Sequence, residues 1–228
     1  MSIDWSVVIE YKDFFIRGFI TTIELTIVGI GFGLLIGLIL GLMQISGKAY
    51  LKIPARIYVD LFRGTPLLLQ VLAIHFAVIP TICEEILQIT PPSALFSGFV
   101  ALSLNAGAYI SEIFRGGIES IEKGQMEAAR SLGMNYAQAM RLVILPQAFK
   151  RMLPPLGNEF IALLKDSSLV TVIAVNDITY AAFTTAKSTF ERMGPYITAA
   201  VMYLIITLIL SRVVFYLEKH FTPQTRKK

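Results

Sequence analysis

The sequence predicts an all-α polytopic membrane protein, a bundle of five transmembrane helices, from its composition, its long apolar runs and its uneven distribution of basic residues. Of the 228 residues, 55% are hydrophobic and 16% are charged, whereas about a quarter of a soluble domain is charged. The mean hydropathy of +0.66 implies more apolar surface than water tolerates, so the surplus has to face lipid. We expect a single domain over residues 1–228.

Five apolar runs account for the predicted spans, because a helix needs roughly 20 residues to cross the hydrocarbon core. They lie at about 18–45, 57–81, 94–114, 152–178 and 195–217. The second and fourth runs also contain charged residues and prolines, so we expect these helices to be broken or buried against others. In the fourth run, Pro154, Pro155 and the following Asp166-Ser-Ser predict an interrupted helix.

The basic residues fall mostly on one side of these spans. With the N-terminus placed outside, the outside segments hold only Lys12, Arg17, Lys187 and Arg192, and the inside segments hold most of the remaining Lys and Arg. Because basic loops stay in the cytoplasm, we expect an N-out, C-in topology. This topology places the polar loop of about 115–151 in the cytoplasm.

A row of glycines marks one face of the first span. Gly29, Gly33, Gly37 and Gly41 recur every four residues, so they share one side of a helix and let a neighbouring helix approach closely. The row favours either helix packing within this bundle or an interface with another subunit.

The chain shows no credible catalytic constellation. The nearest string to a phosphate-binding loop, from Gly41 to Ala49, has five residues between its glycines and Ala where a hydroxyl has to hold magnesium. His75 and His220 lie in different settings, and the single cysteine, Cys83, excludes an internal disulfide and a cysteine-based zinc site. We therefore expect no enzymatic site and no bound metal.

The polar segment "EAARSLGMNYAQAMRLVILP", residues 127–146, stands out in so apolar a chain. Its periodicity predicts a short helix from Gln125 to Leu132, with Met126, Ala129 and Leu132 or Gly133 on one side. Gly133 is expected to stop this helix, and a second helix at about 136–144 is expected to end at Pro146. From the residues alone, the segment is either a docking element gripped by a partner or an amphipathic linker on the membrane surface.

The same segment resembles the cytoplasmic signature of ABC importer permeases. The matching residues are Glu127-Ala128-Ala129, Gly133 and Val143-Ile144-Leu145-Pro146, with Val143 in place of the usual Ile. Nearly the whole chain is similar to the polar amino acid permeases of the histidine/glutamine/arginine type. The stretches that resemble them most are "FRGTPLLLQ" at 62–70, "AYISEIFRGGIESIEKGQMEAARSLGM" at 108–134 and "LPQAFKRMLPPLGNEFIALLKDSSL" at 145–169.

The resemblance implies the permease subunit of an ABC type I importer for polar or basic amino acids, working by alternating access in a bacterial inner membrane. The implied partners are two ATPase subunits that bind ATP and Mg, a second permease copy or sister permease, and an extracytoplasmic solute-binding protein. No cofactor is implied in this chain, and no nucleic acid. A coupling helix at about 123–133 is implied, and the residues expected to couple it to the ATPase are Gln125, Glu127, Ala128, Ala129, Arg130 and Gly133.

Polar residues inside the spans are candidates for the substrate pathway, because ionisable groups in a bilayer face the bundle interior or a wet cavity. Asn105, Tyr109 and Glu112 share one helix face. We expect Glu159 or Asp166 to receive a cationic group. The full set of candidates is Thr65, Gln70, Asn105, Tyr109, Glu112, Glu159, Lys165 and Asp166.

Three alternatives stay open at this point. Lys165–Asp166, and Arg63 with Asp60 or Glu112, are also interpretable as structural ion pairs that hold helices together. A second class of function is an ion-coupled secondary amino acid transporter, with carboxylates as cation ligands and no ATPase. A third is a membrane anchor or scaffold without a conduit.

For a conduit, the apolar residues around 67–72 and 99–104 are expected to form the gate.

Overall fold

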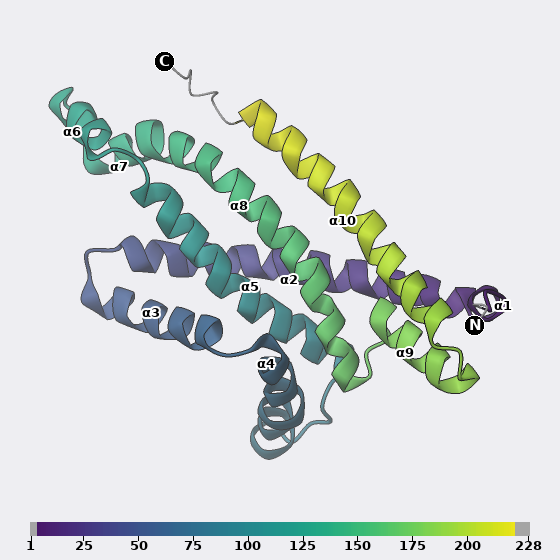
Figure 1. Ribbon diagram of the computed structural model, residues 1–228. Coiled ribbons are helices and arrows are strands. Elements are labelled where there is room, and N and C mark those ends of the chain that lie inside the picture. Colours follow the sequence, from purple (N-terminus) through teal and green to yellow (C-terminus); the bar gives the residue numbers. More distant parts are fainter. Residues whose placement is uncertain (1–3, 222–228) are drawn as a thin grey trace.

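The computed structural model describes residues 4–221, and every regular element in that range is a helix. The α-helices are α1 Ser6–Glu10, α2 Lys12–Ile45, α3 Ala49–Gly64, α4 Leu67–Ala73, α5 Ala94–Glu119, α6 Lys123–Ser131, α7 Tyr136–Ala139, α8 Leu145–Asp166, α9 Ile178–Thr189 and α10 Met193–Phe221. Between them lie the π-helices η1 Ile74–Val78, η2 Thr81–Ile86 and η3 Met140–Ile144, and the 3-10 helix η4 Ser167–Ile173. The helices α5, α8 and α10 run in a similar direction and α2 crosses them, with α6 and α7 at one end of the bundle and α4 and α9 toward the other (Figure 1).

The described residues confirm the prediction of a helical membrane bundle. Four helical stretches are long and apolar enough to cross a membrane: Lys12–Ile45, Leu67–Ile86, Ala94–Glu119 and Met193–His220. The α8 helix is not among them because it carries more polar residues. The number of five spans and the orientation of the chain stay predictions.

The glycine row of α2 packs against α5 of the same chain. A Cβ atom added at Gly33 would lie 2.7 Å from Cβ of Ala106, and one at Gly37 would lie 2.6 Å from Cγ2 of Ile110. The two backbones therefore approach as closely as glycine allows. The interpretation as packing within the bundle is confirmed for these positions.

We expect Gly37→Leu to destabilise the fold, because its side chain would have to displace α5. Overpacking of this kind costs about 1–3 kcal/mol. Gly31→Leu is the matched control on the same helix, since a Cβ there meets nothing within 4 Å. Thermal unfolding of the detergent-solubilised protein should show a lower melting temperature for Gly37→Leu alone, and equal melting temperatures would refute the tight contact.

The second predicted span, 57–81, is broken, as its charged residues and prolines led us to expect. The chain breaks at Thr65, which is extended with φ −121° and ψ 147°, between α3 and α4. Pro66 causes the break, since proline disfavours the helical conformation of the residue before it. The helical stretch Leu67–Ile86 beyond the break is one of the four membrane-spanning candidates.

Two expectations about helix breaks at prolines, at Pro154 and Pro155 and at Pro146, are wrong. Pro154 and Pro155 do not interrupt α8, and the flanking Met152 and Leu156 pack into an apolar cluster that holds this turn. Pro146 does not end a helix either, because α7 continues through η3 directly into α8. Pro146 lies in the first turn of α8, where a helix does not need the missing N–H group. The predicted interruption after Asp166 is confirmed, because η4 begins at the next residue.

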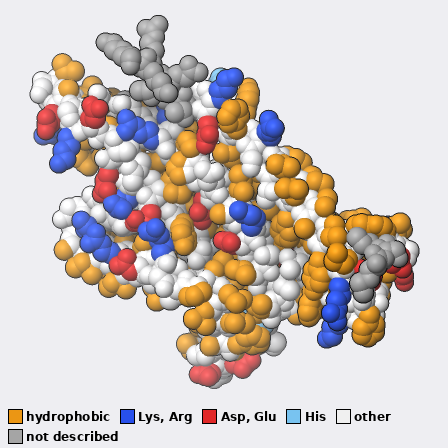
Figure 2. All heavy atoms as spheres, viewed as in Figure 1, with side chains coloured by type: hydrophobic (Ala, Val, Ile, Leu, Met, Phe, Trp, Pro, Cys, Tyr) orange, Lys and Arg blue, Asp and Glu red, His pale blue; other side chains and the backbone are white. Residues whose placement is uncertain are grey.

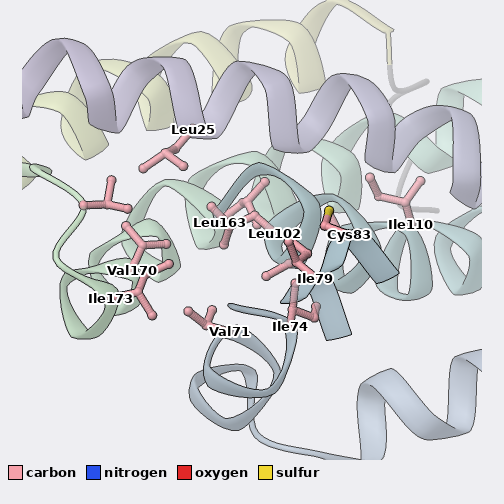
Figure 3. Close-up of a cluster of buried hydrophobic side chains, with 13 residues drawn as sticks. Leu25, Val71, Ile74, Ile79, Cys83, Leu102, Ile110, Leu163, Val170 and Ile173 are labelled. Carbon is pink, nitrogen blue, oxygen red and sulfur yellow. The ribbon is translucent and has the colours of Figure 1, made fainter. Parts of the chain in front are cut away.

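The main apolar core lies where α2, α4, α5, α8 and η4 meet. Leu25, Val71, Leu102, Leu163 and Val170 are buried there and point toward one another (Figure 3). In contrast, α10 exposes large apolar side chains, among them Leu204, Leu208 and Phe215. Figure 2 shows apolar side chains covering this helix on the viewed face, as expected of a helix in contact with lipid.

Candidate functional site

The α6 and α7 helices form a compact two-helix knob at one end of α5 and α8, at the opposite end of the bundle from α4 and α9 (Figure 1). The α6 helix ends at Gly133, whose φ is +86°. The N–H of Gly133 donates to the Arg130 carbonyl at 3.0 Å, and the N–H of Met134 donates to the Ala129 carbonyl at 3.2 Å. These two bonds form a Schellman motif. The motif favours glycine because the residue that follows the C-cap, here Gly133, takes the left-handed conformation. The prediction that Gly133 stops the helix is confirmed.

The next helix, α7, begins on a capping box. The Gln138 N–H donates to Oδ1 of Asn135 at 2.9 Å, and the Asn135 N–H donates to Oε1 of Gln138 at 2.9 Å. Such reciprocal bonds satisfy two amide groups that a helix start would otherwise leave free. Local hydrogen bonds therefore stabilise both the end of α6 and the start of α7.

The knob presents most of the predicted coupling residues to solvent. Ala129 is the exception, since it is 4% exposed on the side where α6 packs against η3. Its small side chain lets α6 lie close to its own chain. The predicted coupling residues that are exposed are Gln125, Glu127, Ala128, Arg130 and Gly133.

One exposed residue of the knob was placed wrongly by periodicity. Leu132 was expected to share a side with Met126 and Ala129, but it is 81% exposed. It is the C-cap residue, where the chain leaves the helical path, so helical periodicity no longer applies to it. Tyr136, which the sequence analysis did not single out, is also exposed, at 58%. The glycine stop just after Leu132 is the signal that could have found this apolar tip.

Hydrogen bonds fasten the knob to the bundle. Arg151 of α8 donates to the carbonyl of Ser120, at the end of α5. Gln147 of α8 donates to the Val143 carbonyl at 2.8 Å and to the side chain of Gln125 at 3.4 Å. These bonds link α8 to the start of α6 and to the end of α5.

Three of the predicted pathway residues meet at the break between α3 and α4. Nδ2 of Asn105 donates to Oε1 of Gln70 at 2.9 Å, and Nε2 of Gln70 donates to Oγ1 of Thr65 at 2.9 Å. The Gln70 amide also donates to the Phe62 carbonyl at 2.7 Å, which the break leaves without a helical partner. The network is buried, with Gln70 7% and Asn105 5% exposed. It joins the broken helix to α5.

We expect Asn105→Ala to lower transport severalfold while leaving association with the ATPase unchanged. The substitution leaves the Gln70 oxygen unpaired in the bundle, at a cost of about 1–3 kcal/mol. Uptake by proteoliposomes, copurification of the ATPase and the melting temperature would be measured together. Asn158→Ala, at an exposed position of α8, is the control. Wild-type uptake kinetics would remove Asn105 from the pathway.

A charged cluster joins α3 to α5. Nη1 of Arg63 lies 3.3 Å from Oε2 of Glu112, and Arg115 bonds the same oxygen at 2.8 Å. The Arg63 guanidinium also lies over the Tyr109 ring, 5.3 Å from its centroid. Of the alternatives for Arg63, the ion pair with Glu112 is the one that forms. Glu112 and Tyr109 therefore take part in an interhelical contact.

The two carboxylates of α8, Glu159 and Asp166, lie on one helix face, with both residues half-buried. Lys165 is exposed and forms no ion pair with Asp166 within residues 4–221. The structural pair Lys165–Asp166 is thus not found, because consecutive helical side chains point in different directions.

One buried carboxylate was missed by the sequence analysis. Asp177, at the N-cap of α9, is fully buried and accepts hydrogen bonds from the N–H groups of Thr179 and Tyr180 at 3.0 and 2.9 Å. The hydroxyls of Thr171 and Tyr203 donate to it at 2.6 and 3.0 Å. An aspartate just before a helical run is the usual signal of an N-cap and could have located it.

A bundle of lipid-facing helices with an internal polar network and a rigid knob at one end has the architecture of a membrane transport subunit. The chain matches the family described as binding-protein-dependent transport system inner membrane component over residues 33–223. The chain therefore belongs to this family and is the membrane permease subunit of an ABC importer. Importers of this class work with an ATPase and a solute-binding protein.

Individual relatives extend the likeness over nearly the whole chain. It is 38% identical over 211 residues to the arginine transport system permease protein ArtQ of Bacillus subtilis, covering 92% of this chain and 94% of the relative. It is 38% identical over 219 residues to the glutamine transport system permease protein GlnP of Escherichia coli, covering 96% and 98%. A crystal structure of an amino acid ABC transporter with histidines has a TM-score of 0.86 and 40% identity, covering 96% of this chain and 100% of that chain.

Proposed function

We propose that this permease carries polar amino acids, basic ones foremost, past the carboxylates of Glu159 and Asp166. The single observation that carries the proposal is the placement of these two half-buried carboxylates on one face of α8, Asp166 at its last residue and Glu159 about two turns earlier. Anionic groups at membrane depth are costly unless something cationic compensates them. Relatives named for arginine and glutamine, and a neighbour solved with histidines, support an amino acid as the substrate.

The spacing of the two carboxylates favours a substrate with two cationic ends. Seven residues of α-helix separate their backbones by about 10 Å along the axis. A basic amino acid carries an ammonium group at one end and a cationic side chain at the other, so one molecule can engage both carboxylates.

The proposed mechanism is alternating access driven through the knob. Two ATPase subunits each grip α6 of one permease copy, and ATP binding draws these helices together. The bonds of Arg151 and Gln147 to the α5–α6 segment transmit that movement to α5 and α8. The main apolar core, including Val71, Phe99 and Leu102, seals the pathway when no substrate is present. We place this assembly, with two copies of the chain, in a bacterial inner membrane.

The function is tested by reconstituting the chain in proteoliposomes with and without its ATPase and binding protein. Labelled arginine, histidine, glutamine and glutamate would be supplied in turn. We expect concentrative uptake only with ATP and both partners, with arginine and histidine ahead of glutamate. Uptake driven by an ion gradient without the ATPase would establish a secondary transporter instead, and no uptake in any mixture would establish a scaffold.

A further inference from the structure

The buried Asp177 carboxylate joins three elements of the fold, and the backbone beside it contacts a fourth. Its own helix, α9, supplies two backbone donors, η4 supplies the Thr171 hydroxyl and α10 supplies the Tyr203 hydroxyl. The adjoining backbone rests on α2, because the Ile178 N–H donates to Oγ1 of Thr22 at 3.2 Å. A Cβ atom added at Gly18 of α2 would lie 2.7 Å from the carbonyl oxygen of Asp177.

This arrangement exceeds what a helix cap requires. A serine or asparagine at this position could accept the backbone bonds of α9 without placing a charge in the interior. A buried carboxylate is tolerated only when several donors surround it, and no Lys or Arg pairs with this one within residues 4–221. The two hydroxyls are therefore the compensation for the charge, and each of them comes from a different helix.

The bond to Thr171 connects this carboxylate to the proposed substrate site. The η4 helix begins directly after Asp166, and Val170 and Ile173 anchor it in the main core. Among the side-chain hydrogen bonds of the described residues, the Thr171 bond is the one that ties η4 to the α9 region. The Ser167 hydroxyl of η4 donates instead to the Leu164 carbonyl of α8.

We infer that Asp177 is a positioning residue: through the Thr171 hydroxyl it holds η4 in place and so sets where the Asp166 carboxylate lies in the pathway. This inference rests on the proposed function of Asp166. The inference assigns different roles to the hydroxyls of Thr171 and Tyr203. The Thr171 bond serves substrate binding, whereas the Tyr203 bond serves only the packing of α10.

The test compares Thr171→Val with Tyr203→Phe in the complex of permease and ATPase. Each variant removes one hydroxyl donor to the same carboxylate at nearly constant shape. Equilibrium binding of labelled L-arginine is measured in detergent, with the melting temperature and the maximal rate of ATP hydrolysis. We expect both variants to lower the melting temperature, Tyr203→Phe by more because its hydroxyl also accepts a hydrogen bond from Thr179 at 3.3 Å. We expect Thr171→Val alone to raise the dissociation constant by about three- to tenfold.

Thr171→Ser restores the hydroxyl, so its dissociation constant should return to within about twofold of wild type. Equal dissociation constants for Thr171→Val and Tyr203→Phe would overturn the inference and leave Asp177 as a structural cap. Failure of Thr171→Ser to restore binding would also overturn it. If the unmodified complex neither binds nor transports L-arginine, the proposed function fails, and the inference fails with it.

Discussion

Gly133→Leu should weaken association with the ATPase while the chain still inserts into the membrane. Gly133 closes α6 at φ +86°, a conformation that costs a leucine about 1–3 kcal/mol. In the variant, the turn at residue 133 changes its conformation to avoid this strain. Binding of the ATPase then has to restore the original turn, at the same free-energy cost. A penalty of this size corresponds to a loss of about 5- to 150-fold in affinity. Affinity capture of the ATPase from detergent extracts would measure it.

Two controls separate the turn from the size of the side chain. Gly133→Asn should retain most of the binding, since asparagine tolerates the left-handed conformation. Gly47→Leu makes the same substitution between α2 and α3, where a Cβ meets nothing within 4 Å and φ is not positive. Normal capture of the ATPase by Gly133→Leu would refute the docking role of the knob.

Glu159→Gln and Asp166→Asn should each reduce arginine uptake by about ten- to a hundredfold, because hydrogen bonds to charged groups are worth about 1.5–3 kcal/mol. The reduction should be smaller for glutamine, which has one cationic group and can engage only one carboxylate. Initial rates in proteoliposomes, measured over a range of concentrations for both amino acids, would quantify the difference. ATPase capture should be unaffected, since neither residue lies in the knob.

The matched control is Asp60→Asn, which removes the same charge from an exposed position of α3. Its arginine kinetics should equal those of wild type. If Glu159→Gln and Asp166→Asn also behave like wild type, or if they impair arginine and glutamine equally, the carboxylates do not select the substrate. A loss of ATPase capture in either variant would instead indicate a general disturbance of the fold.

The structure brings three of the predicted pathway residues together in an arrangement that the sequence did not indicate. Thr65, Gln70 and Asn105 were singled out as polar residues within apolar runs, and the structure brings all three together. The hydrogen bonds among these three side chains could not be predicted from the sequence, because they depend on how the break at Pro66 places α4 against α5. The residues of α8 show the same limit, since Lys165 and Asp166 are neighbours in the chain but do not pair.

Sequence patterns were enough to predict the membrane character of this protein, its all-helical fold and the end of α6 at Gly133. These features depend on hydropathy and on the conformational preferences of single residues, which are local properties. Three other features became evident in the folded structure. The glycine row of α2 faces α5 of the same chain, and Leu132 is exposed at the tip of the knob. Four parts of the fold meet around Asp177. Those outcomes depend on where helices far apart in the chain cross, and a polar group can be buried only where such a crossing supplies its partners.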